Sequence, residues 1–428
     1  MSITRRTVLT GAGGVVGAGA LAAASPSAPA ARAGSAVQTG TALPAPEASG
    51  IEHVVVVMME NRSFDHYLGW LPGARGRQAG LTFTDRYGVP HSTHHLTDTQ
   101  GCAHPDPDHS FEGGRIELNS GACDGWLRAG ENDEFAIGYY TDADLAFYGK
   151  AARDWTVCDS YFSAIMAETY PNRFYQHAAQ TDRIHNSTAV ATMPTIWDRL
   201  AGAGIPARYY YVDVPFTALW GTTYTGISSP YARFLADAAA GTLPAVSFVD
   251  PKFLDEGTGS SADDHPHADI RAGQAFLDEV YDAVRLGPGW DKTVLVVNYD
   301  EWGGFYDHVA PPTAPDAHPE WGLRGFRVPC LVMSPMARRG YVAKGVYDHA
   351  SVLAMIEWRW GLDPLTPRDA AARNLAEVLD FTLHDLSSTA YNVAPFVGLP
   401  CPAGGFADYE DWNALKKLAL DHGWSLPR

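Results

Sequence analysis

Hydrophobic positions along the chain form two short, uninterrupted runs that each end abruptly in polar residues. Residues 51–59 contain four consecutive valines and are followed directly by Glu60 and Asn61. Residues 293–298 form a similar run and are followed within two positions by acidic side chains. Apolar runs of this length, without alternation, are typical of strands that are buried on both faces of a parallel sheet. We therefore predict that both runs are central strands of one sheet.

Strand-like and helix-like patterns alternate through the rest of the sequence. Apolar runs predict strands at 155–162, 209–212, 245–249 and 328–333, and periodic patterns predict helices at 141–154, 195–200, 270–286, 348–360 and 412–422. Residues 71–140 are rich in Gly, His, Asp and Pro, which indicates a long irregular stretch of the kind that usually carries function. The alternation predicts an α/β fold with a mainly parallel central sheet and helices on both faces.

The N-terminal sequence has the order of a twin-arginine export signal. Arg5 and Arg6 precede a Gly- and Ala-rich apolar stretch, which ends at a small-residue cleavage site. We therefore predict a signal peptide at 1–33 that engages the twin-arginine export machinery, a flexible leader at 34–50 and one folded domain at 51–428. The expected product is a secreted protein without a transmembrane anchor, because no later run is long and apolar enough to span a bilayer.

The acidic composition narrows the range of partners. The formal net charge is −18 at pH 7, so the chain has no general electrostatic attraction to nucleic acid. Strongly anionic membranes would repel it, and we expect a monomer that makes only transient contact with a lipid surface. The five cysteines lack a metal-finger spacing. In an exported chain some of them can oxidise, and we predict a disulfide between Cys102 and Cys123.

Pairs of oxygen-bearing side chains at the ends of the two central strands are candidate metal ligands. Glu60 and Asn61 follow the first strand, and Asp300 and Glu301 follow the second. Ligands in open parallel sheets collect beyond the carboxyl ends of the strands, and adjacent carboxylates repel unless protonated or bridged by a cation. A divalent metal is therefore favoured over an ordinary acidic surface turn. Oxygen ligands suit calcium, magnesium or manganese, and nearby histidines keep zinc possible.

Thr169 is a candidate nucleophile at the start of a predicted helix. Pro171 suits the first turn of that helix, so Thr169 lies at its N-terminus, where backbone amides and the helix dipole favour a phosphate group. An ordinary helix cap is the alternative role for this threonine. His265 or His267 is a candidate acid catalyst or ligand, or alternatively a capping or loop residue, and His104 and His109 lie in a stretch that either faces the substrate or forms a solvated turn.

Five motifs together resemble one family of enzymes. MMENRSFDHYLG, ETYPNRF, DDHPHADI, YDEWGGFYDHV and GFRVP with YDHASVLAMIEW occur in this order over residues 51–360. They resemble the bacterial phosphoesterase family that holds haemolytic and non-haemolytic phospholipases C together with certain acid phosphatases. The resemblance implies an alkaline-phosphatase-like α/β fold, export, and hydrolysis of a phosphate ester at a metal site.

The same resemblance assigns roles to individual residues. It implies that the metal is held by Glu60, Asn61, Thr169, Asp300 and Glu301. It also implies that Thr169 is the nucleophile and that the phosphate is surrounded by His109, His265, His308 and His104. One histidine, most simply His265 or His109, would protonate the leaving group.

The predicted activity is that of a phospholipase C. We expect hydrolysis of phosphatidylcholine or phosphatidylethanolamine to diacylglycerol and a phosphorylated head group through a phosphothreonine. Longer family members continue into C-terminal β domains, whereas this sequence stops at Arg428. If those domains help to engage lipid, soluble phosphate esters become realistic substrates, and a non-specific acid phosphatase is the alternative. A catalytically silent metal-binding protein is a further one. Aromatic residues near the motifs either hold a cationic head group or belong to the core: Trp126, Trp155, Tyr161, Tyr170, Trp302, Phe305 and Tyr306.

Overall fold

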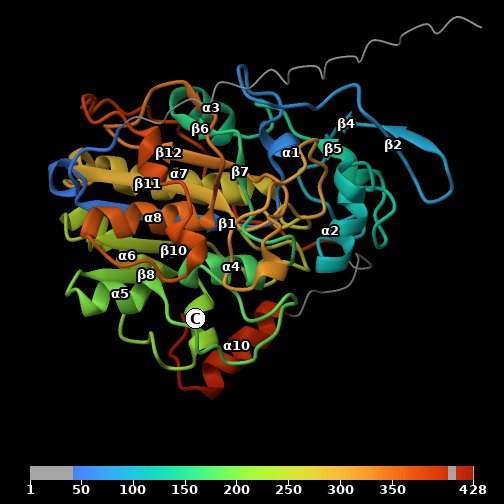
Figure 1. Cartoon of the computed structure of the whole chain (residues 1–428). Coiled ribbons are helices and arrows are strands. Elements are labelled where there is room, and N and C mark those ends of the chain that lie inside the picture. Colours follow the sequence, from blue (N-terminus) through green and yellow to red (C-terminus); the bar gives the residue numbers. More distant parts are fainter. Residues whose placement is uncertain (1–41, 403–410, 428) are drawn as a thin grey trace, which may run out of the picture. The chain divides into compact units, whose positions relative to one another are not determined.

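The centre of the molecule is an eight-stranded sheet, described here from a computed structural model that covers residues 42–402 and 411–427. The strand order is β13-β6-β12-β11-β1-β10-β8-β9 (Figure 1). Its strands are β1 (His53–Met59), β6 (Thr156–Cys158), β8 (Ala207–Tyr211), β9 (Ser228–Pro230), β10 (Val246–Asp250), β11 (Thr293–Tyr299), β12 (Cys330–Met333) and β13 (Tyr341–Ala343). Strand β12 runs antiparallel to β11 and β6, and the other pairings are parallel. The predicted mainly parallel α/β sheet is confirmed.

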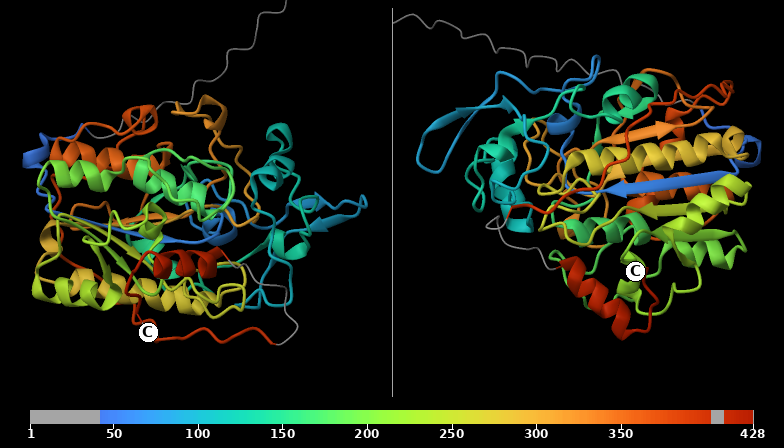
Figure 2. Two further views of the ribbon diagram at one scale, coloured as in Figure 1. Left: turned by 90° about the horizontal axis from the view of Figure 1, so that it is seen from below. Right: turned by 180° about the vertical axis from the view of Figure 1, so that it is seen from behind.

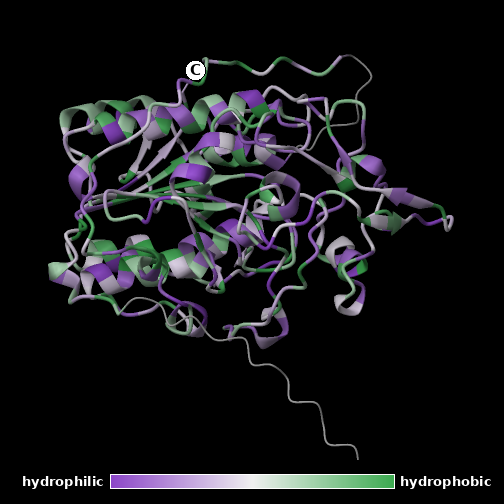
Figure 3. Ribbon diagram, turned by 90° about the horizontal axis from the view of Figure 1, so that it is seen from above, coloured by the Kyte–Doolittle hydropathy of each residue, from purple (hydrophilic) through white to green (hydrophobic). Residues whose placement is uncertain are grey.

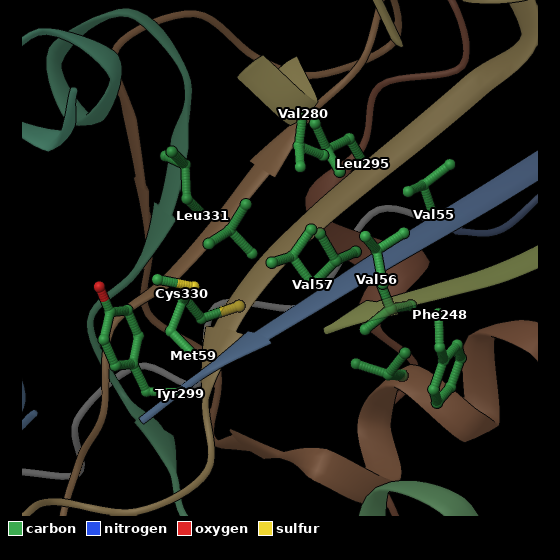
Figure 4. Packing of buried hydrophobic residues seen from close by; sticks show 14 of the residues in the cluster. Val55, Val56, Val57, Met59, Phe248, Val280, Leu295, Tyr299, Cys330 and Leu331 are labelled. Atoms are coloured by element: carbon green, nitrogen blue, oxygen red, sulfur yellow. The ribbon is translucent and has the colours of Figure 1, made fainter. Parts of the chain in front are cut away.

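Strand β1 lies between β10 and β11, as its unbroken apolar sequence predicts. Its valines are fully or almost fully buried, and they pack with apolar side chains of the neighbouring strands (Figure 4). Met59 is in register with Tyr299 of β11, and Asp300 N donates to Met59 O at 3.1 Å. The two polar strand ends predicted from the sequence therefore meet at one edge of the sheet.

Helices cover both faces of this sheet. Figure 2 shows α4 and α8 in one layer and α6 and α7 in the other, with the strands between them. The hydrophobic colouring in Figure 3 follows the central strands, while the helices are mixed. The helices are α1 (Phe64–Leu68), α2 (Phe111–Leu118), α3 (Tyr148–Asp154), α4 (Thr169–Ala178), α5 (Ile196–Gly202), α6 (Tyr231–Ala240), α7 (Ile270–Leu286), α8 (His349–Trp360), α9 (Pro367–Ala370) and α10 (Asp411–Asp421). None of those within the described ranges has the length and apolar character that crossing a bilayer requires.

The irregular segment predicted at 71–140 lies beyond the carboxyl ends of the strands. Figure 2, right, shows β1 pointing toward it. Besides α2 it holds only short elements, namely β2 (Thr82–Thr84), β3 (Pro90–Ser92), β4 (His94–His95), β5 (Gly138–Tyr139) and two 3₁₀ helices at Asn119–Gly121 and Glu134–Ile137. A further short pair elsewhere is β7 (Tyr161–Phe162) with β14 (Tyr347–Asp348). The sequence did not predict α2, whose first turn is capped by Ser110 Oγ accepting from Gly113 N. Loops of this kind can carry side chains to the strand ends.

Three predictions about local structure need correction or qualification. The helix expected from residue 141 begins at Tyr148, because Asp144 accepts from the backbone and side chain of Thr141 and closes a turn there. The disulfide joins Cys102 to Cys401, with Cα atoms 5.5 Å apart, so the predicted pair was wrong and Cys123 is a buried free thiol. The predicted signal at 1–33 lies outside the described residues, and within the predicted leader Pro46–Ala48 form a 3₁₀ turn.

Candidate functional site

The ends of β1 and β11 interlock through a strained turn. Asn61 has a φ of 60°, an uncommon conformation for a side chain other than glycine, and its backbone N donates to Asp300 Oδ1 at 3.2 Å. A Cβ added to Gly303 would lie 2.0 Å from Asn61 O, so only glycine allows the second turn to approach the first this closely. Strain held in place at a strand end is typical of functional sites.

The Asn61 side chain contacts two other predicted site residues. Thr169 Oγ1 donates to Asn61 Oδ1 at 3.4 Å, and Asn61 Nδ2 lies 3.4 Å from His109 Nε2. Thr169 is the first residue of α4, and the cap position belongs to Glu168. The threonine hydroxyl is therefore turned toward Asn61 and does not act as the helix cap. All three side chains are at least 96 % buried.

The helix N-terminus offers fewer free amides than the sequence suggested. Tyr170 N donates to Asn186 Oδ1 at 2.7 Å, Asn172 N donates to Glu168 O at 3.4 Å, and Pro171 has no N–H. The amides of Tyr170 and Asn172 are thus used within the fold, and the hydrogen bonding of a phosphate at this helix start stays a prediction. The dipole of α4 remains as an electrostatic contribution.

Acidic side chains around Asn61 carry more negative charge than nearby cations balance. Glu60, Asp300 and Glu301 are fully buried. Burial raises the pKa of Glu301 to about 8 against the opposing charge of His109, and burial and the charge of Asp300 raise that of Glu60. Glu301 Oε2 accepts from Gly303 N at 2.7 Å, whereas Glu301 Oε1 accepts no hydrogen bond among the described residues, and Glu60 contacts Arg173 and Glu256.

These buried carboxylates fit a bound divalent cation. Buried carboxylates are otherwise satisfied by hydrogen bonds, pairing or protonation. Their all-oxygen chemistry, together with the Asn61 amide and Thr169 hydroxyl, suits a hard cation. The identity of the metal is open, because His109 lies beside the same amide.

Arg173 is a site residue that the sequence analysis missed. It is fully buried, and Nε donates to Asp300 Oδ2 at 3.0 Å. Its Nη2 lies 3.2 Å from Glu60 Oε1, and Nη1 lies 3.4 Å from Asp250 Oδ1. One guanidinium thus contacts three acids. Its position four residues after Thr169 on α4 could have indicated it, since such residues share a helix face.

Two of the four predicted histidines lie at the site. The rings of His109 and His265 are 6.2 Å apart, and His265 Nε2 lies 3.5 Å from Asp106 Oδ2. Burial opposes protonation of His109, but the charges of Glu301 and Asp106 outweigh it and raise its pKa to about 10. Burial, His267 and His109 lower the pKa of His265. The two rings therefore have opposite electrostatic surroundings.

The other two histidines are engaged elsewhere. His308 Nδ1 lies 2.5 Å from Asp65 Oδ2, in a buried network in which Arg327 donates to Asp65 and Asp307. His104 Nδ1 lies 2.8 Å from Asp133 Oδ2, and its side chain is 34 % exposed. Among the described residues, no hydrogen bond or ion pair joins either ring to Thr169 or Asn61.

The aromatic residues considered for head-group binding belong to the core. At most 1 % of each is exposed: Trp126, Trp155, Tyr161, Tyr170, Trp302, Phe305 and Tyr306. Several make specific structural hydrogen bonds, such as Trp302 Nε1 to Glu117 Oε2 at 2.7 Å. Their alternative role as packing residues is the one that the structure supports.

Comparisons with known proteins show the family of this chain. The model of the Phosphoesterase family matches residues 51–363. Phospholipase C B of Mycobacterium tuberculosis is 32 % identical over 88 % of this chain and 84 % of its own. Non-specific phospholipase C6 of Arabidopsis thaliana is 32 % identical over 77 % of this chain and 72 % of its own. Non-hemolytic phospholipase C of Pseudomonas aeruginosa is 31 % identical over 84 % of this chain and 63 % of its own.

Similarity to solved structures is weaker. A protein in the alkaline phosphatase superfamily from Vibrio parahaemolyticus is 10 % identical with a TM-score of 0.38, over 76 % of this chain and 69 % of its own. The lipoteichoic acid synthase LtaP from Listeria monocytogenes is 8 % identical with a TM-score of 0.39, over 88 % of this chain and 92 % of its own. Scores of this size support no conclusion about the site.

Proposed function

The chain belongs to the phosphoesterase family, and from that premise we propose that it is a metal-dependent phospholipase C-type phosphodiesterase. The proposed substrates are glycerophospholipids with choline or ethanolamine head groups, cleaved to diacylglycerol and the phosphorylated head group. The phospholipases C among its relatives support this class. The observation that carries the proposal is the buried cluster around Asn61. Its backbone N donates to Asp300, and its side chain contacts Thr169 and His109.

Thr169 is the proposed nucleophile. The Thr169 hydroxyl gives up its proton to solvent, and its Oγ1 forms a bond to phosphorus while the bond from phosphorus to the diacylglycerol oxygen breaks, so the head-group phosphate is transferred to the threonine. Water then attacks phosphorus, which releases the phosphorylated head group and restores the hydroxyl. A divalent cation held by Glu60, Asn61, Thr169, Asp300 and Glu301 would supply Lewis acidity and neutralise phosphate charge.

His109 and His265 are the proposed proton-transfer groups. His109 is the nearer to the nucleophile, because its Nε2 lies beside the Asn61 amide that Thr169 contacts. It is placed to donate a proton to the departing diacylglycerol oxygen, and the same nitrogen can later accept a proton from water. Asp106 Oδ2 lies 3.5 Å from His265 Nε2 and supplies a negative charge beside that ring. His104 and His308 contact Asp133 and Asp65 instead and take no part in this scheme.

Export belongs to the same proposal. We propose that residues 1–33 direct the chain through the twin-arginine machinery and that the mature enzyme acts as a monomer on lipid surfaces. The order of the arginine pair, apolar stretch and small-residue site supports this. Expression with the Arg5 and Arg6 pair replaced by lysine would test it, since export should fail while cytoplasmic accumulation continues.

A substrate panel tests the activity. The mature chain is assayed on phosphatidylcholine, phosphatidylethanolamine and a simple phosphomonoester, before and after chelation and after metal is restored. We expect diacylglycerol release that far exceeds monoester cleavage, is lost on chelation and returns with metal. Fast monoester cleavage with inert lipids would replace the proposal by an acid phosphatase, and inactivity on all substrates would indicate a silent metal-binding protein.

A further inference from the structure

A second group of buried acids adjoins the proposed catalytic site. Glu60, Glu256 and Asp263 each place one carboxylate oxygen within 4.8 Å of the others, and all three are at least 96 % buried. Glu60 N also donates to Asp263 O at 2.8 Å, which fixes the end of β1 against this loop. Glu256 and Asp263 are not among the ligands that the sequence motifs imply.

Part of this group has no partner. Asp263 Oδ2 and Glu256 Oε2 accept no hydrogen bond among the described residues, whereas the Glu60 carboxylate interacts with Arg173 and with Glu256. Asp263 is nevertheless held firmly, because its Oδ1 accepts from Ser261 Oγ at 2.7 Å and from His265 N at 2.9 Å. These two hydrogen bonds fix the orientation of the Asp263 carboxylate, while its Oδ2 accepts no hydrogen bond among the described residues. Buried carboxylate oxygens without partners are costly unless a cation or a proton satisfies them.

The protein's own cations do not balance this group. Arg173 reaches Glu60 Oε1 at 3.2 Å, but it also contacts Asp250 and Asp300. Lys252 is the basic residue of the adjoining loop, and its Nζ is bound to Ser260 O and Asp255 instead. Several buried acids therefore share one guanidinium.

We propose that Glu60, Glu256 and Asp263 bind a second divalent cation, with Glu60 shared between it and the cation of the proposed catalytic site. Three carboxylates and no nitrogen or sulfur ligand suit a hard ion such as calcium, magnesium or manganese. The ion would neutralise the buried charge and hold Glu60 in place at the end of β1. The competing arrangement is a proton shared between Glu60 and Glu256.

Metal stoichiometry separates these two arrangements. The mature protein is stripped with chelator, saturated with Mn²⁺, freed of excess ion and analysed for bound manganese. Glu256→Gln keeps the size of the side chain but removes its charge, and we expect it to bind one equivalent fewer than wild type. Glu357→Gln is the matched control, because Glu357 is a buried acid with an unpartnered Oε1 outside this group, and it should bind as many ions as wild type. An unchanged count in Glu256→Gln would overturn the proposal.

A second readout needs no variant. Electron paramagnetic resonance of the Mn²⁺-saturated wild-type protein should show two magnetically coupled ions, because both contact Glu60. The spectrum of isolated Mn²⁺ at saturation would overturn the shared site. Neither readout involves a substrate, so the second cation site can fail while the proposed phospholipase activity stands, and the reverse is equally distinguishable.

Discussion

Removing the Arg173 guanidinium should destabilise the fold strongly when no metal is present. In Arg173→Met the side chain keeps most of its volume, but Glu60, Asp250 and Asp300 lose their shared cation. Nη2 also donates to Met58 O and Met59 O, both at 3.3 Å, so two strand-end carbonyls lose a donor. Removing one partner of a buried ion pair costs about 3–5 kcal/mol, and we expect a loss of unfolding free energy in this range.

Urea unfolding of the mature protein measures this loss, in chelator and in saturating metal. The loss should be largest in chelator, because a bound cation takes over part of the charge neutralisation. Asp250→Asn in the Arg173→Met background should restore part of the stability, since one stranded acid is removed. A loss below about 1 kcal/mol in chelator, with no recovery in the double variant, would refute the role of Arg173 as the buried counter-ion.

Three further predictions concern the nucleophile, a buried histidine and the disulfide. Thr169→Ala should lower kcat by several orders of magnitude, and Thr169→Ser, which restores a hydroxyl, should recover much of it in the same lipid assay. Burial lowers the pKa of His177 to about 3, so the unfolded chain binds a proton below pH 6.5 that the folded chain rejects. His177 therefore does not lower the free energy of unfolding above pH 6.5, and lowers it by up to about 1.4 kcal/mol per pH unit from there toward pH 3. His177→Gln should flatten this pH dependence in urea titrations. Cys102→Ser should lower the free energy of unfolding by about 2–5 kcal/mol in the same urea assay. The disulfide to Cys401 joins residues 299 positions apart, so it restricts the unfolded chain strongly.

Each of these three has a contradicting result. Near wild-type turnover by Thr169→Ala would exclude threonine as nucleophile. An unchanged pH slope in His177→Gln would mean that other groups cause the acid sensitivity. A Cys102→Ser protein as stable as wild type, with Cys123→Ser as the matched single-thiol control, would show that the disulfide is dispensable for folding.

The sequence predicted those features that depend on local pattern. Strands β1 and β11 lack an alternation of apolar and polar residues because both of their faces are covered. Helix α7 has a clear apolar stripe and ends at Gly-Pro-Gly, so its predicted limits match the structure. The acids after β1 and β11 meet because parallel neighbours end at the same edge of the sheet. Thr169 was placed at the start of α4 by Pro171, which needs no hydrogen bond there.

Features that depend on distant contacts were not predictable in this way. Cys401 pairs with Cys102 only because the chain near Leu399 returns beside Gln100, whose Nε2 donates to Leu399 O at 2.8 Å. Glu256 lies in a loop without periodicity, and only the fold brings it to Glu60. His308 belongs to the motif that follows β11, but its backbone N donates to Asp65 Oδ2 on α1 and its ring contacts the same oxygen.

The most direct test of the account is the covalent state of Thr169 during turnover. The mature enzyme is mixed with phosphatidylcholine, quenched with acid within the first turnovers, digested and analysed by mass spectrometry. We predict that the peptide containing Thr169 carries phosphocholine, because the bond to diacylglycerol breaks before water attacks phosphorus. A plain phosphate on Thr169, formed from a monoester but not from the lipid, would indicate a phosphatase, and an unmodified Thr169 in an actively hydrolysing sample would contradict the proposed nucleophile.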